Sequence, residues 1–167
     1  MANVGLSGRI YAKATSVTNE AANLVADFRG GISAEISEEF AEWFGQYLTR
    51  QAAVLVKFDF PITISEVAFD VDNLNVIWGA SKNAADTLKS ALAEAATSYT
   101  FDATLALPQL EWLVECQQGG KTFQIFCKDA LVRGVPLNFT NTDYVVHDVV
   151  LLPIEADSEL VKLLIEN

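Results

Sequence analysis

The residues that could carry out catalysis are few, and their spacing forms no standard catalytic motif. The single histidine, His147, lies beside Asp148 in an alternating apolar segment. Consecutive residues of a strand point to opposite faces, so Asp148 could not orient the imidazole of His147. Either cysteine would need His147 nearby in space to act as a nucleophile, and nothing in the sequence requires that arrangement. The pattern favours an ordinary strand histidine.

The two cysteines flank a predicted β-hairpin. The Gly-Gly pair at 119–120 separates two alternating segments, which is typical of a two-residue turn with positive φ angles. In that register Cys116 faces Phe123 and Cys127 faces Trp112. The two sulfurs are then roughly 13 Å apart along the sheet. A disulfide needs Cα atoms within about 7 Å, so we expect two free thiols, as in a reducing cytoplasm.

The sequence also contains no standard metal-binding or phosphate-binding motif. One histidine and two cysteines do not make an ordinary zinc site without several carboxylates. The Gly-Gly pairs at 30–31 and 119–120 lack the spacing and the following Lys-Ser/Thr of phosphate-binding loops. We therefore expect no metal, no cofactor and no enzymatic activity.

Carboxylates gather in one short segment. Residues 35–42 carry a charge of −4 and residues 143–167 carry −5, out of a net −11. Runs of acids arise readily in an acidic chain, and a solvated surface is the simplest interpretation. The four acids of the first segment are Glu35, Glu38, Glu39 and Glu42.

The same part of the chain holds four aromatic side chains within eight residues. If the segment is an irregular loop, these side chains form an exposed apolar patch of the kind that marks an interaction surface. If it is a helix, they are its core-facing side. Residues 32–40 could also continue as a strand, so helix, strand and loop all stay open for residues 38–48. The aromatic residues are Phe40, Trp43, Phe44 and Tyr47.

Composition bounds the class of protein. The chain has 167 residues, of which 51% are hydrophobic, and 22 acidic residues stand against 11 basic ones. Such a chain can bury a sizeable core and is too apolar to be disordered. The acid excess argues against a protein that coats nucleic acid, because phosphate binding needs clustered Lys and Arg. The N-terminal residues lack the features of a secretory signal, and no apolar run is long enough to span a membrane.

The periodicity predicts a mainly β (α+β) single domain over residues 1–167. Only Lys82–Ala96 has a helical apolar stripe, and Leu74–Gly79 could form a helical turn closed by Gly79. We expect a β-sandwich or barrel of about seven or eight strands with one flanking α-helix. A long connection is expected near 37–50 and a C-terminal tail near 157–167. Strands are predicted within 6–14, 32–36, 51–71 (broken at Pro61), 99–107, 110–128, 130–132 and 144–152, with 159–165 either a last strand or a tail.

The order of these pieces resembles the tail tube (major tail) proteins of long-tailed bacteriophages. Three stretches, together about half of the chain, carry the resemblance. They are the opening Gly-Leu-Ser-Gly-Arg-Ile-Tyr of 5–11, an expected long β-hairpin arm of 54–60 and 66–71 leading into 72–79, and the closing pieces 126–132, 136–139 and 143–152.

The resemblance implies a structural protein of the virion tail that is assembled in the host cytoplasm. Such proteins form hexameric rings that stack into a hollow tube, a long loop reaches across to neighbouring subunits, and strands of six subunits surround the lumen. DNA passes through as non-specific cargo, and no reaction is catalysed. The implied partners are further copies of the chain and other tail proteins: a terminator, a tape measure and, where present, a sheath.

On this interpretation the acidic composition suits a conduit, because a like-charged wall does not hold phosphates. We expect Glu35, Glu38, Glu39 and Glu42 to face the lumen and Phe40, Trp43, Phe44 and Tyr47 to contact neighbouring subunits. The stretch Thr15–Gly30 and the tail Asp157–Asn167 are expected to become ordered on assembly.

Two other function classes remain open from the sequence. One is another ring-forming phage protein, such as a tail terminator, a neck protein or a capsid decoration protein. The other is a small-molecule-binding β-barrel in which Trp43, Trp78 and Trp112 line a cavity rather than the core.

Overall fold

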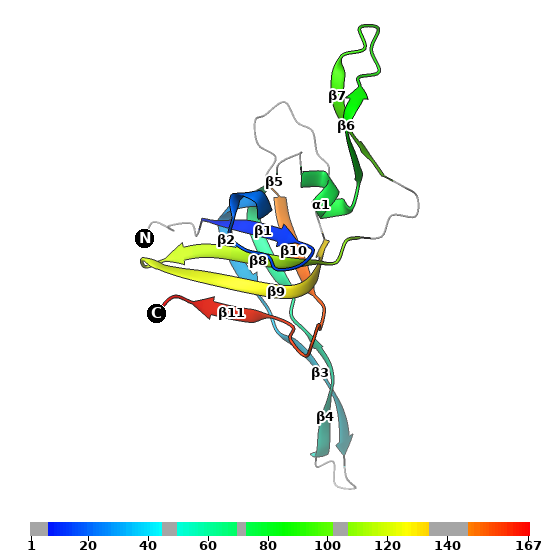
Figure 1. Cartoon of the computed structure of the whole chain (residues 1–167). Helices are drawn as coiled ribbons and strands as arrows, with labels where there is room; N and C mark the ends of the chain where they lie inside the picture. Colours follow the sequence, from blue (N-terminus) through cyan, green and yellow to red (C-terminus); the bar gives the residue numbers. More distant parts are fainter. Residues whose placement is uncertain (1–6, 45–49, 70–72, 102–106, 134–146) are drawn as a thin grey trace.

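The computed structural model describes residues 7–44, 50–69, 73–101, 107–133 and 147–167, and in these ranges the chain is mainly β (Figure 1). Two short helical segments occur among the strands, the 3-10 turn η1 (Ala21–Asn23) and the helix α1 (Leu74–Trp78). The strands in these ranges are β1 (Gly8–Lys13), β2 (Leu24–Ala34), β3 (Ser37–Phe44), β4 (Arg50–Asp59), β5 (Ile62–Phe69), β6 (Ser81–Thr87), β7 (Ala95–Thr100), β8 (Leu110–Gln118), β9 (Lys121–Arg133), β10 (His147–Pro153) and β11 (Lys162–Ile165).

Six of these strands close into an antiparallel barrel. They pair in the order β10-β5-β2-β1-β8-β9, and β9 pairs back onto β10. The long strand β9 makes this closure with its last residues, 130–133, while residues 123–126 pair with β11 outside the ring. The closed barrel removes most free strand edges, and β11 is an extra strand at the side.

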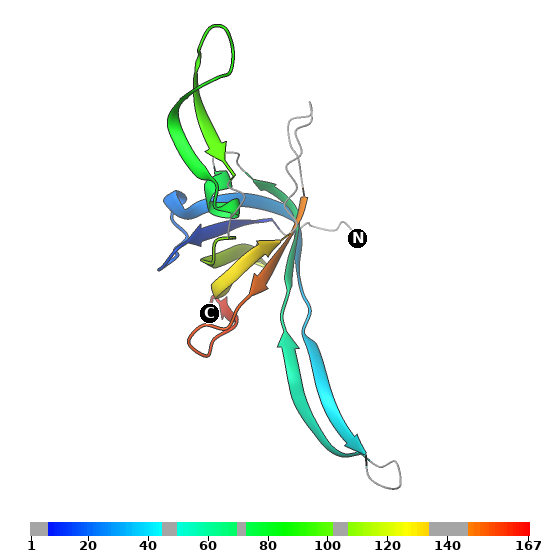
Figure 2. The same ribbon diagram turned by 90° about the vertical axis from the view of Figure 1, so that its right-hand side faces the viewer.

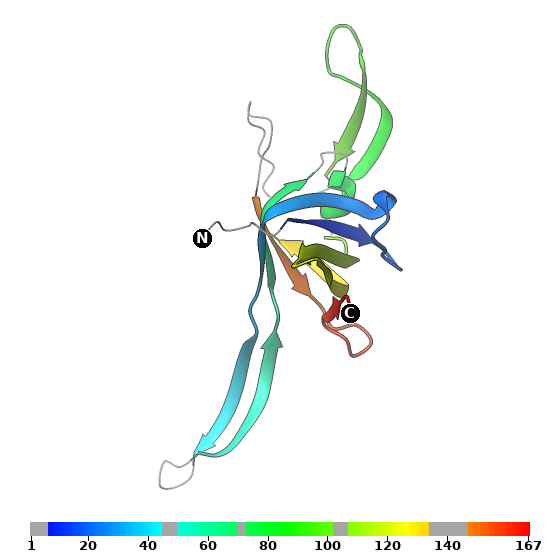
Figure 3. The same ribbon diagram turned by 90° about the vertical axis from the view of Figure 1, so that its left-hand side faces the viewer.

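Two strand pairs project from the barrel as arms. Strand β3 pairs with β4 and strand β6 pairs with β7, each in a separate two-stranded sheet. The arms extend in opposite directions from the barrel in every view (Figures 1, 2 and 3). Pro61 lies between β4 and β5, where the first arm returns to the barrel, and its missing N–H fits the predicted break.

The structure confirms a β-barrel and corrects the rest of the predicted fold class. The sandwich alternative and the flanking helix are not seen in the described residues, which hold eleven strands and not seven or eight. The predicted helix Lys82–Ala96 is wrong, because this segment forms the β6–β7 arm. Its apolar stripe consists largely of alanine, and Leu88 and Leu92 are exposed at the tip. Helical periodicity is a weak guide where the stripe has no surface to pack against.

The helical turn predicted at Leu74–Gly79 is confirmed. Helix α1 spans five residues, and Gly79 ends it in the left-handed conformation with φ 66°. Glycine is favoured at this position because it has no Cβ to clash. None of the helices in the described part of the chain is long and apolar enough to cross a membrane.

The barrel interior is filled by side chains. Trp112 is the largest of them; it is fully buried, and its indole N–H donates a hydrogen bond to the carbonyl oxygen of Ala130 at 3.2 Å. A Cβ on Gly8 would lie 2.5 Å from the ring of Phe28, so this ring covers a position that only glycine can occupy. The other fully buried large side chains are Ile10, Ile62, Ile64, Val67, Val114, Cys127, Val149 and Leu151.

The predicted hairpin register is also confirmed. Strands β8 and β9 pair Cys116 with Phe123 and Trp112 with Cys127, and the turn glycines at 119–120 both have positive φ. Both cysteines are free and buried. The prediction of two free thiols is therefore confirmed.

Burial of Cys127 predicts a loss of stability at alkaline pH. Desolvation raises the pKa of this thiol from 9.0 to about 12. The folded state keeps a proton that the unfolded state releases above pH 9.0, so stability is lost as the pH rises from there toward about 12. The contribution is up to about 1.4 kcal/mol per pH unit. Urea unfolding across this range should show a steeper decline for the wild type than for Cys127→Ala. Equal slopes in the two proteins would contradict the assignment.

Segments that the sequence suggested would order on assembly are already folded in the subunit. Leu24 to Gly30 lie in β2, which pairs with β1 on one side and β5 on the other. The preceding loop is held by Val17, whose backbone N–H donates to the carboxylate of Glu111 at 2.8 Å. The C-terminal segment forms β11 on β9. These segments thus form paired strands in the subunit, and their ordering on assembly stays a prediction.

Candidate assembly surface

The β3–β4 arm brings the predicted acidic and aromatic residues together. The segment expected to be a long connection near 37–50 is an antiparallel strand pair, of which residues 45–49 lie outside the described residues. Strand β3 carries three glutamates and three aromatic residues, and β4 supplies an apolar partner at most positions. Of the three forms left open by the sequence, helix, strand and loop, the structure shows the strand over Ser37–Phe44.

One face of the arm carries Phe40, Leu55 and Phe58. Residues directly opposite on paired strands share a face, and Phe40 pairs with Leu55 while Glu38 pairs with Phe58. The three apolar side chains are between 45% and 48% exposed. Glu42 lies on the same face because it is two residues beyond Phe40. We call this surface face B of the arm.

The opposite face of the arm, face A, is apolar as well. Trp43 pairs with Ala52, and Val54 pairs with Ala41. Trp43 is 57% exposed and Val54 is 54% exposed. A sheet of two strands that is apolar on both faces cannot bury either face by itself, so both faces stay exposed in the subunit.

The structure also locates the remaining predicted contact residues. Phe44 ends β3, opposite Arg50, and Tyr47 lies outside the described residues. Phe40 and Trp43 are on opposite faces of β3. The exposed positions of Phe40 and Trp43 agree with the prediction of an apolar patch and exclude the alternative that these two side chains belong to the core.

The four predicted lumen acids do not share one face. Glu35 lies in the connection between β2 and β3, while Glu38, Glu39 and Glu42 lie on β3. Glu38 and Glu42 are on face B, whereas Glu39 is on face A opposite Lys57. A single acidic wall built from one face of this strand therefore contains at most the pair Glu38 and Glu42.

Sequence reasoning gave β4 the wrong partner. The expected hairpin arm of 54–60 with 66–71 does not form, because β5 pairs with β2 and β10 in the barrel. Strand β4 instead pairs with β3. Its run Ala-Ala-Val-Leu-Val is apolar at consecutive positions, which is the pattern of a strand buried on both faces. In the subunit residues 52–55 of this run are instead exposed on an arm. The conflict between a two-face burial pattern and an exposed strand was the available signal for an interface.

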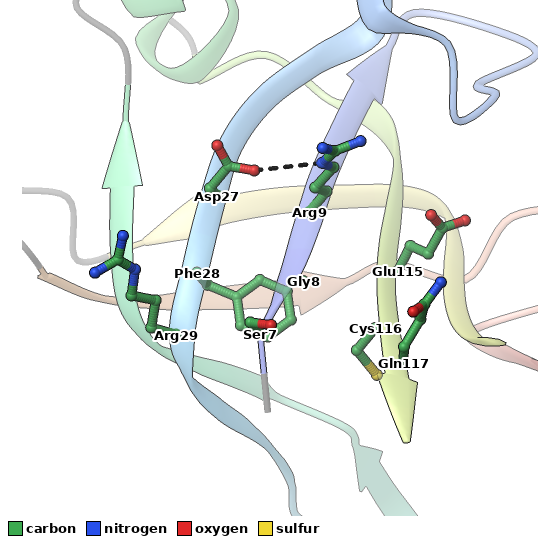
Figure 4. Close-up of a pocket in the computed structure, with 9 residues that line it drawn as sticks. All are labelled: Ser7, Gly8, Arg9, Asp27, Phe28, Arg29, Glu115, Cys116 and Gln117. Atoms are coloured by element: carbon green, nitrogen blue, oxygen red, sulfur yellow. Dashed lines mark ion pairs between the residues drawn. The ribbon is translucent and has the colours of Figure 1, made fainter. Parts of the chain in front are cut away.

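A polar depression of about 480 Å³ lies across β1, β2 and β8 (Figure 4). Arg9 forms an ion pair with Asp27 at 3.6 Å, and both side chains are mainly exposed. A hydrogen bond with Tyr11, followed by the nearby charges of Asp27 and Glu115, raises the pKa of Arg9. The depression holds both charge signs in similar number and so selects neither anions nor cations. It is lined by Ser7, Gly8, Arg9, Asp27, Phe28, Arg29, Glu115, Cys116 and Gln117.

Asp148 and the two cysteines, three of the residues considered for catalysis, have structural surroundings in the subunit. Asp148 accepts a hydrogen bond from the backbone N–H of Glu66 at 3.2 Å, at a point where Glu66 has a φ of 56°. Burial raises the pKa of both cysteine thiols, so neither is a thiolate nucleophile at neutral pH. Within the described ranges, no group of three or more His, Cys, Asp or Glu residues is arranged to hold a metal ion.

The tryptophans do not form one cluster. Trp112 lies in the barrel core, Trp78 packs against that core and makes an edge contact with Phe101, and Trp43 is exposed on the arm. The three indoles of the small-molecule hypothesis therefore do not line a shared cavity.

Comparisons with known proteins identify no family for this chain. The chain matches no model of a known protein family, and no curated protein sequence matches it.

Proposed function

We propose that this protein is a structural subunit that assembles with copies of itself into stacked hexameric rings, forming the tail tube of a long-tailed phage through which DNA is ejected. The observation that carries the proposal is the β3–β4 arm, a projecting strand pair with exposed apolar side chains on both faces. The ring size and the phage context come from the resemblance of the sequence to tail tube proteins.

The arm favours self-assembly over a role as a monomer. An isolated two-stranded hairpin is marginally stable in water, so an arm of this length is stabilised when both faces are covered. An arm apolar on both faces fits between two neighbours rather than against one. Repeated from subunit to subunit, such a contact is head-to-tail and builds rings or filaments.

The charge of the chain suits a conduit for DNA. A net charge of −11 gives the assembled wall few cationic groups to hold phosphates. Glu35, Glu38, Glu39 and Glu42 remain the proposed lumen acids, and Glu35 is the first candidate because it lies outside the arm, whose two faces the proposed subunit contacts cover. A tube structure with a basic or neutral lumen would contradict this part of the proposal.

Electron microscopy of the purified protein tests the proposed function. Long tubes of uniform width are the expected result. Discrete rings would instead favour the other ring-forming phage proteins, a terminator, a neck protein or a decoration protein. Monomers at high concentration would overturn self-assembly altogether.

A further inference from the structure

Strand β11 leaves a free strand edge beside the closed barrel. It pairs with β9 on one side, and no described strand pairs with its other side. All four of its residues are exposed, and three are large apolar side chains: Leu163 at 60%, Leu164 at 43% and Ile165 at 52%. An exposed apolar edge strand is a template for pairing with another chain.

The strand is held in place at both ends, so its edge is preformed. Before it, the backbone N–H of Ile154 donates to the carbonyl of Asp129 at 2.8 Å, and the ammonium of Lys128 contacts the carboxylate of Asp157. After it, the backbone N–H of Glu166 donates to the carbonyl of Thr122 at 3.0 Å. An incoming strand therefore meets an ordered edge and not a loose tail.

The direction of the backbone groups along β11 follows from that last bond. The N–H of Glu166 points toward β9, and N–H groups alternate along an antiparallel strand. The N–H and C=O groups of Leu163 and Ile165 consequently point away from β9 and are open to a partner.

The side chains of the same two residues continue the core face of the barrel. Leu163 lies opposite Ile125, and Ile165 lies opposite Phe123. Both partners on β9 are partly buried and pack against the core. The apolar inner surface thus extends past β9 and ends uncovered at β11, where one more strand would cover it.

We propose that the free edge of β11 receives strand β4 of a second copy of this chain, added as a further antiparallel or parallel strand. This inference rests on the proposed self-assembly and names the two surfaces that meet. The available strands with open edges are those of the arms, and β4 has the apolar run needed to cover Leu163 and Ile165.

Net charge distinguishes β4 from β3 as the strand that would pair with β11. Residues 155–166 carry four carboxylates and one lysine, a net charge of −3. Strand β3 also carries −3, from Glu38, Glu39 and Glu42, whereas β4 carries +1, from Arg50 and Lys57 against Asp59. The acidic C-terminal edge repels β3 and attracts β4.

Proline substitution tests the open backbone edge. Leu163→Pro removes an N–H that points outward and leaves the bonds to β9 intact, because proline is tolerated at the outer side of an edge strand. We expect at least ten-fold less assembled material, measured by sedimentation, with unchanged thermal unfolding of the subunit. The matched control Leu163→Thr keeps the N–H and a β-forming side chain and should retain assembly. Assembly of Leu163→Pro at the wild-type level would overturn the proposal.

Cross-linking between copies identifies the occupant. Copies with Val54→Cys are mixed with copies carrying Leu163→Cys under oxidising conditions, with Ala53→Cys and Leu55→Cys used in parallel to cover the register. Both native thiols are buried in the core and so remain unreactive. We expect mixed disulfide dimers. Dimers of Leu163→Cys alone would show that β11 pairs with itself and would overturn the assignment to β4.

The two proposals fail in different ways. The wild-type protein could form tubes while the mixed cross-link is absent and Leu163→Pro still assembles. That result would overturn the edge contact and would still support the tail tube. Mixed cross-links without tubes or rings would support the edge contact and contradict the tail tube.

Discussion

Replacing Phe40, Leu55 and Phe58 together by serine is expected to abolish assembly while the barrel stays folded. All three lie on face B of the arm and are nearly half exposed in the subunit, so assembly can bury the remaining area. Covering that area contributes about 1 kcal/mol for each side chain. The combined loss of about 3 kcal/mol lowers each subunit contact by roughly a hundred-fold, and a tube repeats that contact at every subunit.

Sedimentation and electron microscopy measure this result, with circular dichroism as the check on folding. A matched control is the double variant Arg9→Ser and Asp27→Ser, which removes an exposed ion pair from the barrel without changing the net charge. Exposed pairs contribute at most about 1 kcal/mol, so this control should assemble normally. Equal loss of assembly in both proteins would mean that face B has no special role, and full assembly of the triple variant would contradict the arm contact.

Two tryptophan substitutions should have opposite effects on stability and on assembly. Trp112→Ala empties the centre of the barrel and leaves a cavity, which costs about 3–5 kcal/mol of unfolding free energy. For a chain of this size that corresponds to a melting temperature lowered by roughly 10 °C. Trp43→Ala removes the same side chain from face A of the arm, where it is 57% exposed, and should change the melting temperature little.

The effects of the same two variants on assembly should be the reverse of their effects on stability. Trp43→Ala is expected to reduce tube formation because the indole is a large apolar contact on face A. Trp112→Ala should still assemble at a temperature where it remains folded, since its side chain is enclosed in the subunit. Differential scanning calorimetry and sedimentation on the same samples measure the two effects. A large fall in melting temperature for Trp43→Ala would place that indole in a core and contradict the exposed arm.

The sequence predicts best where neighbouring residues determine the structure. The hairpin of β8 and β9 was predictable to the exact pairing of Cys116 with Phe123, because a Gly-Gly turn fixes the register of the strands it joins. The left-handed end of α1 at Gly79 was predictable for a similar local reason. In both cases the conformation of one or two residues decides the result.

The arms were not predictable, because their form depends on what lies around them. The segment Lys82–Ala96 has the periodicity of a helix and folds as a hairpin, since alanine gives a helical stripe little to bury. The sequence around Trp43 left a loop, a helix and a strand open, and the segment is a strand. The barrel closes where β9 pairs with β10. No sequence pattern predicts that these two strands are partners.

The opposite directions of the two arms have a consequence for growth of the proposed tube. A subunit that extends β3–β4 one way and β6–β7 the other has no twofold symmetry between its ends (Figure 1). A polymer of such subunits is polar, so one terminus displays unoccupied arms of the first kind and the other displays arms of the second kind. Elongation then proceeds at different rates at the two termini, and the proteins that cap them must be built differently.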